Sequence, residues 1–266
     1  MKHFIITLLA LGLAFPAFAK IVEKEVEYQA GDVNLKGFIA YDSSVKEQRP
    51  GVLVVHEWWG HNEYARERAR KLAKLGYVAF AVDMYGDGKQ ASHPQDAQKF
   101  SSEIANNIEL GKSRFIAAMN LLKQHQATNK NNIAAIGYCF GGAVVLQMAR
   151  EGLDLDAVAS FHGSLGTSHP AKPGNVKAKI LIAHGGADPF VSGEQITGFL
   201  KEMNNAGAEY KFVAYSGAVH AFTNPAADEY GKKFNIPLRY NKAADQASWI
   251  ELQQLLKSSF DQNSSL

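Results

Sequence analysis

Residues 137–142, which read Gly-Tyr-Cys-Phe-Gly-Gly, place the only cysteine of the chain where it could act as a nucleophile. They follow an apolar run at 132–136 that predicts a buried strand, and they precede an aliphatic stretch at 143–149 that predicts a packed helix. A strand, a glycine-flanked turn and a helix are the setting of a nucleophile elbow, here with cysteine in the serine position. Cys139 is therefore the candidate nucleophile, and the alternative is a small buried side chain without a chemical role.

After such an elbow, the acid and then the histidine base follow along the chain, and two residues follow Cys139 in this order. Asp188 comes just after a predicted strand, at the edge where open α/β sheets form their sites. His220 is the only histidine beyond it, in a loop after the last predicted strand. An imidazole can take the thiol proton and later protonate the leaving group, while the carboxylate fixes its tautomer. We therefore predict a Cys139–His220–Asp188 triad, with the N–H of Phe140 as one oxyanion donor.

Alternating apolar strands and helices indicate the fold that must position these residues. The pattern predicts an α/β fold, a mainly parallel, doubly wound sheet with helices on both faces. No internal repeat or linker divides it, so residues 20–266 are expected to form a single domain. The predicted strands are 21–29, 33–41, 51–55, 77–82, 132–136, 157–161, 180–184 and 210–214, and the predicted helices lie at 63–75, within 94–126, at 143–149, at 192–206 and at the carboxyl terminus.

The first residues have the organisation of a secretory signal peptide. Lys2 begins a short basic segment, residues 4–15 are apolar, and Ala17-Phe18-Ala19 fits a cleavage site. The apolar run is too short to span a bilayer, which disfavours the alternative of a membrane anchor. We expect residues 1–19 to be removed after Ala19 and the mature chain to be secreted or periplasmic.

Composition limits the possible partners. The 266 residues include 28 Lys and Arg and 26 Asp and Glu, a formal net charge of +2, and the two signs are interspersed. No basic stripe suits a nucleic acid, and no amphipathic helix suits a membrane surface. A single cysteine excludes an internal disulfide, and the lack of a Cys-x-x-Cys pair argues against a thiol redox protein. We expect a monomer that acts on a small molecule.

A metal site is a further alternative, because His56, Glu57 and His61 lie close together after the strand predicted at 51–55. The zinc motif His-Glu-x-x-His would need a histidine at position 60, which is Gly60. We therefore expect no metal, and this loop instead becomes the expected source of the second oxyanion donor.

Several motifs along the chain are those of one hydrolase family. They are His-Glu-Trp-Trp-Gly at 56–60, Gly-Tyr-Val-Ala at 76–79, Asp-Met-Tyr-Gly at 83–86, Gly-Tyr-Cys-Phe-Gly-Gly at 137–142, Asp-Pro at 188–189 and His-Ala-Phe at 220–222. Through them the chain resembles the dienelactone hydrolase (carboxymethylenebutenolidase) family of the α/β-hydrolase superfamily. The resemblance implies that no metal or organic cofactor is used, that Glu57 meets the resting thiol of Cys139, and that Trp58 supplies the second oxyanion N–H.

The sequence departs from the family at two positions that bear on the substrate. Members that cleave dienelactone carry arginines for the substrate carboxylate, and this chain has Gly86 and Asn224 there, neither of which can pair with a carboxylate in bidentate fashion. Trp59, Tyr85 and Phe222 are expected to line an aromatic pocket, unless they are core residues.

The expected function is hydrolysis of an ester or lactone by an exported, cofactor-free enzyme through a thioester acyl-enzyme. Two alternatives remain, which are a thiol-dependent redox protein and a non-catalytic binding protein on the same fold.

Overall fold

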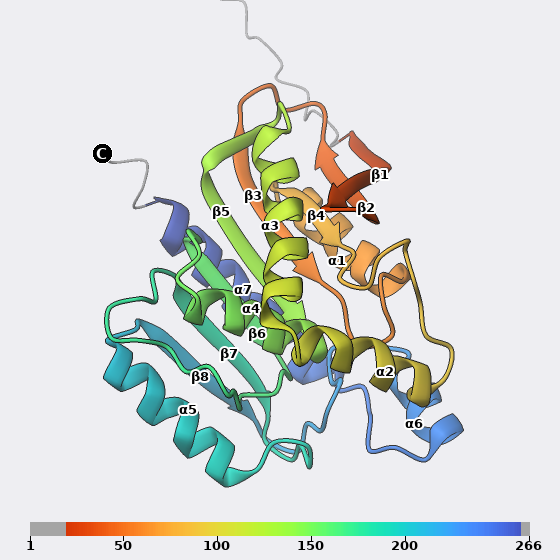
Figure 1. The fold of residues 1–266 in the computed structure, drawn as a ribbon, viewed down its shortest axis with the longest axis vertical. Coiled ribbons are helices and arrows are strands. Elements are labelled where there is room, and N and C mark those ends of the chain that lie inside the picture. The colour runs from red at the N-terminus through yellow and green to blue at the C-terminus, as the bar shows by residue number, and fades with distance from the viewer. Residues whose placement is uncertain (1–19, 262–266) are drawn as a thin grey trace, which may run out of the picture.

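An eight-stranded sheet runs through residues 20–261, the part of the chain that the computed structural model describes (Figure 1). Its strands are β1 Ile21–Ala30, β2 Val33–Asp42, β3 Arg49–Val55, β4 Val78–Val82, β5 Thr128–Tyr138, β6 Ala157–Phe161, β7 Lys179–Gly185 and β8 Tyr210–Tyr215. The order across the sheet is β1-β2-β4-β3-β5-β6-β7-β8. The β1–β2 and β2–β4 pairs are antiparallel and all the others parallel, which confirms the predicted mainly parallel sheet. The signal peptide predicted at 1–19 lies outside the described residues and stays a prediction.

Helices cover both faces of the sheet. They are α1 Glu63–Lys74, α2 Pro94–Ala105, α3 Ile108–Gln124, α4 Phe140–Arg150, α5 Gly193–Ala206, α6 Ala227–Phe234 and α7 Lys242–Asp261. Side chains of α1 and α7 pack in the core on one face, and side chains of α3, α4 and α5 pack in the core on the other. The short α6 was not predicted, because it makes only about two turns and Ala227 is its only buried residue.

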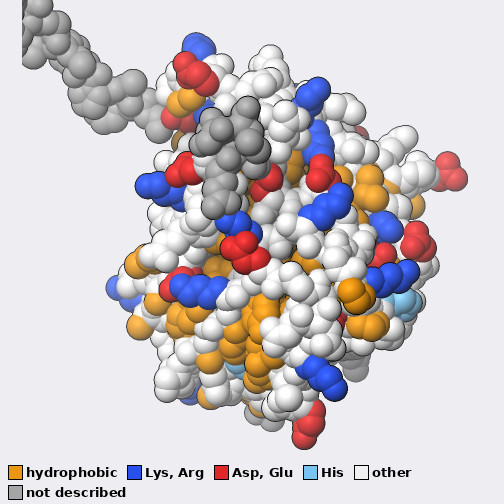
Figure 2. Space-filling view, turned by 90° about the vertical axis from the view of Figure 1, so that its left-hand side faces the viewer, with side chains coloured by type: hydrophobic (Ala, Val, Ile, Leu, Met, Phe, Trp, Pro, Cys, Tyr) orange, Lys and Arg blue, Asp and Glu red, His pale blue; other side chains and the backbone are white. Residues whose placement is uncertain are grey.

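The central strands are apolar without alternation because each of their faces is covered by helices. Every residue of β4 and β6 is buried, whereas β8 at the sheet edge is partly exposed. On the face shown in Figure 2, Lys and Arg side chains are interspersed with Asp and Glu. Within residues 20–261, no helix combines the length and the apolar character that crossing a bilayer requires.

The chemically important loops leave the same edge of the sheet. β3 leads into the loop that carries Glu57 and Trp58, and β5 leads directly into Cys139. β7 and β8 end shortly before Asp188 and His220. Because these strands are parallel, their carboxyl ends gather the four loops at one place, as expected for sites in open α/β sheets.

Gly141 lets the amino terminus of α4 approach the loop after β3 closely. A Cβ atom at this position would lie 2.4 Å from the carbonyl oxygen of Val55 and 2.6 Å from that of His56. The N–H of Gly141 donates to the His56 carbonyl at 3.1 Å. Any larger residue would therefore push the helix away from backbone that has little freedom to move.

We expect Gly141→Ala to lower the free energy of unfolding by about 1–3 kcal/mol, because the methyl group overpacks against backbone. Thermal denaturation followed by circular dichroism should show a fall in Tm of several degrees. Gly193→Ala at the start of α5 is the matched control, since a Cβ there meets no atom within 4 Å. The control should be neutral or slightly stabilising. Equal Tm values for the two variants would contradict the proposed packing role of Gly141.

Candidate active site

Cys139 occupies a strained turn between β5 and α4. Its backbone has φ 53° and ψ −115°, a region that residues with a side chain rarely adopt, as expected for a nucleophile elbow. Its N–H donates to the carbonyl of Phe161 at 2.9 Å and to Nδ1 of His162 at 3.1 Å. The side chain is partly exposed at the amino terminus of α4, where the helix dipole favours a negative charge.

Asp188 and His220 form a buried pair beside this cysteine. His220 Nδ1 donates to Asp188 Oδ2 at 2.8 Å, and the other carboxylate oxygen accepts the N–H of Phe190 at 2.9 Å. The Asp188 side chain is completely buried. Because Asp188 occupies Nδ1, Nε2 is the ring nitrogen that remains for the thiol. The structure thus brings together the three residues that the sequence placed in a triad.

The charge state of His220 depends on Cys139. Burial alone lowers the pKa of an imidazole, but the electrostatic interactions with Cys139 and Asp188 and the hydrogen bonds with both residues outweigh that effect. Together they raise the pKa of His220 to about 10. At neutral pH the arrangement therefore favours the protonated imidazole of His220.

Glu57 is buried and contacts a different partner from the one that the resemblance implied. Its Oε2 accepts the side-chain N–H of Asn224 at 2.6 Å, and its Oε1 has no hydrogen-bond partner within residues 20–261. Burial raises the pKa of Glu57 to about 7, although the hydrogen bond from Asn224 and the positive charges of His220 and Arg68 oppose the rise. The thiol interacts with His220 instead. The expected pairing of Glu57 with the resting thiol is therefore not the arrangement in this structure.

Phe140 and Trp58, the expected oxyanion donors, both line the cavity at Cys139. The N–H of Phe140 belongs to the first turn of α4, where no helix carbonyl is available to accept it. Tyr85 supports both residues, since its hydroxyl donates to the Trp58 carbonyl at 3.1 Å and its ring packs 5.4 Å from that of Phe140.

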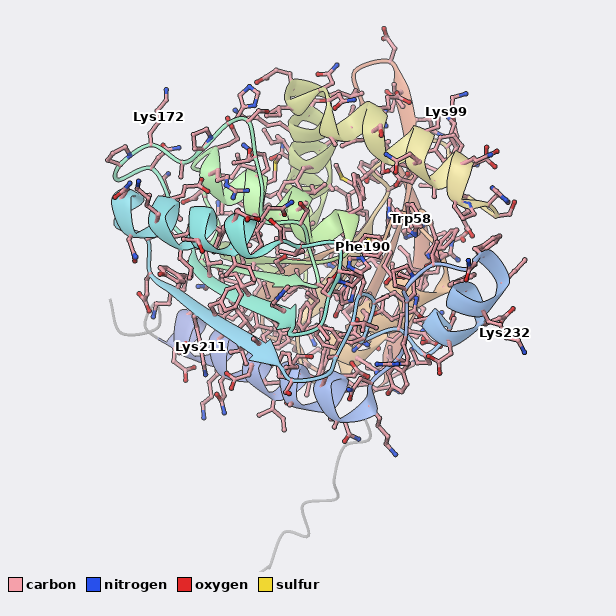
Figure 3. The ribbon with its side chains drawn as sticks, turned by 90° about the horizontal axis from the view of Figure 1, so that it is seen from below. Trp58, Lys99, Lys172, Phe190, Lys211 and Lys232 are labelled. Carbon is pink, nitrogen blue, oxygen red and sulfur yellow. The ribbon has the colours of Figure 1, made fainter. Side chains whose placement is uncertain are left out.

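The cavity at Cys139 has a volume of about 340 Å³. α2 supplies part of the lining, and so do Phe190 and Trp58, which lie near one another in Figure 3. Its lining residues are Trp58, Gln98, Ser101, Ser102, Ala105, Cys139, Phe140, Ala143, Ser164, Phe190, His220 and Leu238. These residues include no lysine and no arginine, so His220 is the one side chain of this set that can carry a positive charge.

Trp59, Tyr85 and Phe222, the residues expected to form an aromatic pocket, do not line the cavity at Cys139. Trp59 is only 3% exposed and stacks on Tyr230 at 4.5 Å, outside this cavity. Phe222 is completely buried and packs against Tyr215. Tyr85 lies behind Phe140 and does not reach the cavity surface. Aromatic side chains near a site are often core residues, and these three are buried in the core.

The two positions compared with the family's arginines also lie away from the cavity. A Cβ at Gly86 would lie 3.0 Å from Val33 Cγ1, and Gly86 has φ +88°, which disfavours any larger residue. Asn224 is 3% exposed and turned toward Glu57. These two substitutions therefore do not decide whether the cavity lining carries a lysine or an arginine.

His162 is a site residue that sequence reasoning missed. Its Nδ1 accepts the N–H of Cys139, so the proton is on Nε2, which donates to Thr223 Oγ1 at 2.7 Å. The Thr223 hydroxyl also meets the Tyr64 hydroxyl at 2.6 Å. Burial, followed by the charge of His220, lowers the pKa of His162 well below its usual value. His162 directly follows β6 at the same sheet edge as Cys139, and this position in the sequence could have identified it as a site residue.

His56 and Glu57, the first two residues of the possible zinc motif, form hydrogen bonds with the backbone and with Asn224. His56 Nδ1 donates to the Glu57 carbonyl at 2.6 Å, and His56 Nε2 accepts the N–H of Met84 at 3.3 Å. Within residues 20–261, no group of three or more His, Cys, Asp or Glu side chains is arranged to hold a metal ion.

Comparisons with known proteins agree with this architecture. Residues 35–260 match the model of the dienelactone hydrolase family. The protein usf of Aquifex pyrophilus is 32% identical over 209 residues, which cover 77% of this chain and 88% of that protein. A dienelactone hydrolase-like promiscuous phosphotriesterase from metagenomic libraries is 31% identical with a TM-score of 0.83, covering 90% of this chain and 98% of that one. The solved structure called m3DLH is 32% identical with a TM-score of 0.84 and the same coverage.

The raised pKa of Glu57 predicts a pH-dependent stability. Between the usual value of 4.5 and about 7, the folded chain holds this proton and the unfolded chain does not. The free energy of unfolding therefore falls as the pH rises through this range, by up to about 3 kcal/mol from this group. Glu57→Gln should remove that fall.

Urea denaturation at pH 5 and pH 8 measures the difference. Glu67→Gln on the exposed side of α1 is the matched control and should keep the wild-type pH dependence. If Glu57→Gln also keeps it, the raised pKa of Glu57 is wrong.

Proposed function

The chain belongs to the dienelactone hydrolase family, whose members act on ester or lactone bonds, and we propose that it hydrolyses neutral esters or lactones through a Cys139–His220–Asp188 triad. The observation that carries this proposal is the buried His220–Asp188 pair, 2.8 Å between Nδ1 and Oδ2, beside a cysteine at a helix amino terminus. A nucleophile, its base and the group that orients the base are the parts that acyl transfer requires.

Acylation begins when Nε2 of His220 takes the proton of the Cys139 thiol and the sulfur attacks the carbonyl carbon of the substrate. The carbonyl π electrons move to oxygen, and the N–H groups of Phe140 and Trp58 donate to the resulting oxyanion. The dipole of α4 favours the same negative charge. The intermediate then collapses, the bond to the alcohol oxygen breaks, and His220 gives its proton to that oxygen. A thioester on Cys139 and a free alcohol remain.

Deacylation reverses the role of His220. The imidazole, now neutral, takes a proton from a water molecule whose oxygen attacks the thioester carbonyl. Collapse of the second intermediate releases the carboxylic acid and returns the sulfur to its starting state. Asp188 keeps Nδ1 protonated throughout and stabilises the imidazolium each time it forms.

Glu57 takes no part in the covalent steps of this proposal. Its carboxyl group, held by Asn224, lies close enough to His220 for the charge of each to affect the other. When ionised, it stabilises the imidazolium form of His220. Glu57 therefore affects the proton transfers indirectly, by stabilising the imidazolium form of His220.

The lining of the cavity supports a neutral substrate. A buried carboxylate without a positive partner carries a large desolvation cost. The lining residues offer no lysine or arginine, and His220 is already engaged by Asp188. The hydroxyl, amide and aromatic side chains that α2 and residues 164 and 190 contribute to the lining suit an uncharged ester or lactone.

Cys139→Ala should lower kcat for p-nitrophenyl acetate by at least about a thousandfold, because the nucleophile is lost while oxyanion stabilisation remains. His220→Ala and Asp188→Asn should each be strongly impaired, and EDTA should have no effect. Ser216→Ala, an exposed change in the same loop as His220, is the control and should keep wild-type activity.

Full activity of Cys139→Ala would exclude this triad. Loss of activity with EDTA that added zinc restores would instead indicate a metal-dependent reaction. A wild-type chain that binds esters without turnover would favour the non-catalytic alternative.

A matched pair of esters tests the charge preference of the pocket. We expect kcat/KM for p-nitrophenyl butanoate to exceed that for the p-nitrophenyl monoester of succinate by at least about tenfold, or about 1.4 kcal/mol of transition-state stabilisation. The two substrates share a leaving group and differ in the terminal carboxylate. A preference for the succinate ester that weakens as salt is added would contradict the neutral pocket.

A further inference from the structure

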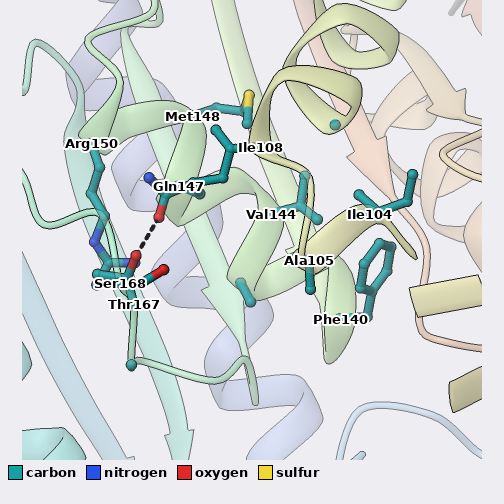
Figure 4. Close-up of a pocket in the computed structure, with 13 residues that line it drawn as sticks. Ile104, Ala105, Ile108, Phe140, Val144, Gln147, Met148, Arg150, Thr167 and Ser168 are labelled. Atoms are coloured by element: carbon teal, nitrogen blue, oxygen red, sulfur yellow. Dashed lines mark hydrogen bonds between the residues drawn. The ribbon is translucent and has the colours of Figure 1, made fainter. Parts of the chain in front are cut away.

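A second cavity of about 230 Å³ runs along α4 next to the catalytic one (Figure 4). It lies between α4, the turn from α2 to α3 and the segment 166–168. We call it the α4 groove, and its lining residues are Ile104, Ala105, Ile108, Gly111, Phe140, Ala143, Val144, Gln147, Met148, Arg150, Gly166, Thr167 and Ser168. Nothing in the proposed reaction uses its distal part.

The α4 groove continues directly from the catalytic cavity. Ala105, Phe140 and Ala143 line both. Phe140, Val144 and Gln147 follow at helical spacing, so they form a stripe along one side of α4. Cys139 is the N-cap of the same helix. The groove therefore leads away from the sulfur along the helix axis.

The groove is apolar near Cys139 and polar at its far end. Ile104 and Val144 lie close to Phe140 in Figure 4, and Ile108 lies further along the groove, beside Gln147 and Met148. At the far end the Thr167 hydroxyl donates to Gln147 Oε1 at 2.8 Å. The Arg150 guanidinium is neutralised by Glu202, with N–O distances of 2.8 and 2.9 Å. The groove thus suits an uncharged aliphatic chain and offers no free cation for an anion.

The position of His220 decides which half of an ester would enter the groove. His220, Phe190 and Leu238 line only the catalytic cavity. Since His220 must protonate the leaving oxygen, the alcohol half lies on that side. We propose, on the basis of the proposed function, that the α4 groove binds the aliphatic acyl chain of the substrate, which stays attached to Cys139 in the thioester.

The helix sets the length of chain that fits. Phe140 and Gln147 are seven residues apart on α4, which is about 10 Å along the axis. With carbon–carbon bonds of about 1.5 Å and tetrahedral bond angles, an extended chain advances about 1.25 Å per carbon, so about eight carbons span this distance before meeting the polar end. Medium-length acyl groups are the class of substrate that this groove selects.

A series of p-nitrophenyl esters tests the proposal, with acetate, butanoate, hexanoate and decanoate as acyl groups. kcat/KM should rise by about three- to fourfold for each buried methylene up to hexanoate, and should level off by decanoate. Ile108→Trp fills the groove, and we expect it to bring the hexanoate-to-acetate ratio close to one. Glu109→Trp, an exposed change on the same helix, is the matched control and should keep the wild-type ratio.

A binding measurement separates this proposal from the proposed function. Hexanamide should raise the Tm of wild type and of Glu109→Trp, and should not raise that of Ile108→Trp. This pattern would support the groove even in the absence of any ester turnover, whereas lack of turnover alone would contradict the proposed function. A chain-length preference unaffected by Ile108→Trp, or one that follows the alcohol half in an alkyl acetate series, would overturn the assignment of the groove to the acyl chain.

Discussion

The close contact between the start of α4 and the loop after β3 is the constraint on which the site depends. Gly141 allows this contact, and its N–H donates to the His56 carbonyl at 3.1 Å. The contact brings two segments that are far apart in the sequence to the same point, one carrying Phe140 and the other Trp58. The strained backbone of Cys139 holds the sulfur between them, and the surrounding packing sustains that strain.

The three histidines near Cys139 differ in their pKa shifts. Burial lowers the pKa of His56 and of His162, so these neighbouring imidazoles stay neutral and act only through hydrogen bonds. The pKa of His220 moves in the opposite direction, because Cys139 and Asp188 face it. Three histidines within one small region thus take different roles, which are set by their partners and not by their residue type.

Sequence patterns predicted the fold and the meeting of Cys139, Asp188 and His220 at one edge of the sheet, because both follow from local signals. Continuous apolar strands, the glycines of the elbow and the rule that sites lie at the carboxyl ends of parallel strands were sufficient for Cys139, Asp188 and His220. The partner of Glu57 was missed, since Asn224 lies 167 residues away and no local pattern links the two.

The pocket was missed for a different reason. Its walls are polar residues of α2, such as Gln98 and Ser101, which in a sequence look like any solvated helix face. Trp59, Tyr85 and Phe222, which were expected to line the pocket, are buried in the core. The sequence alone does not distinguish an aromatic residue that lines a cavity from one that packs in the core.

The loop that follows β8 contacts several of the residues around Cys139. His220 meets the sulfur and Asp188, Thr223 meets His162, and Asn224 meets Glu57. These contacts are made by residues so close in the chain that none can shift without moving the others. Substitutions among them are therefore not independent, and the effect of each depends on which residues occupy the other positions. We expect the substitutions that this loop tolerates to be paired or compensated, whereas changes at neighbouring surface positions can be tolerated singly.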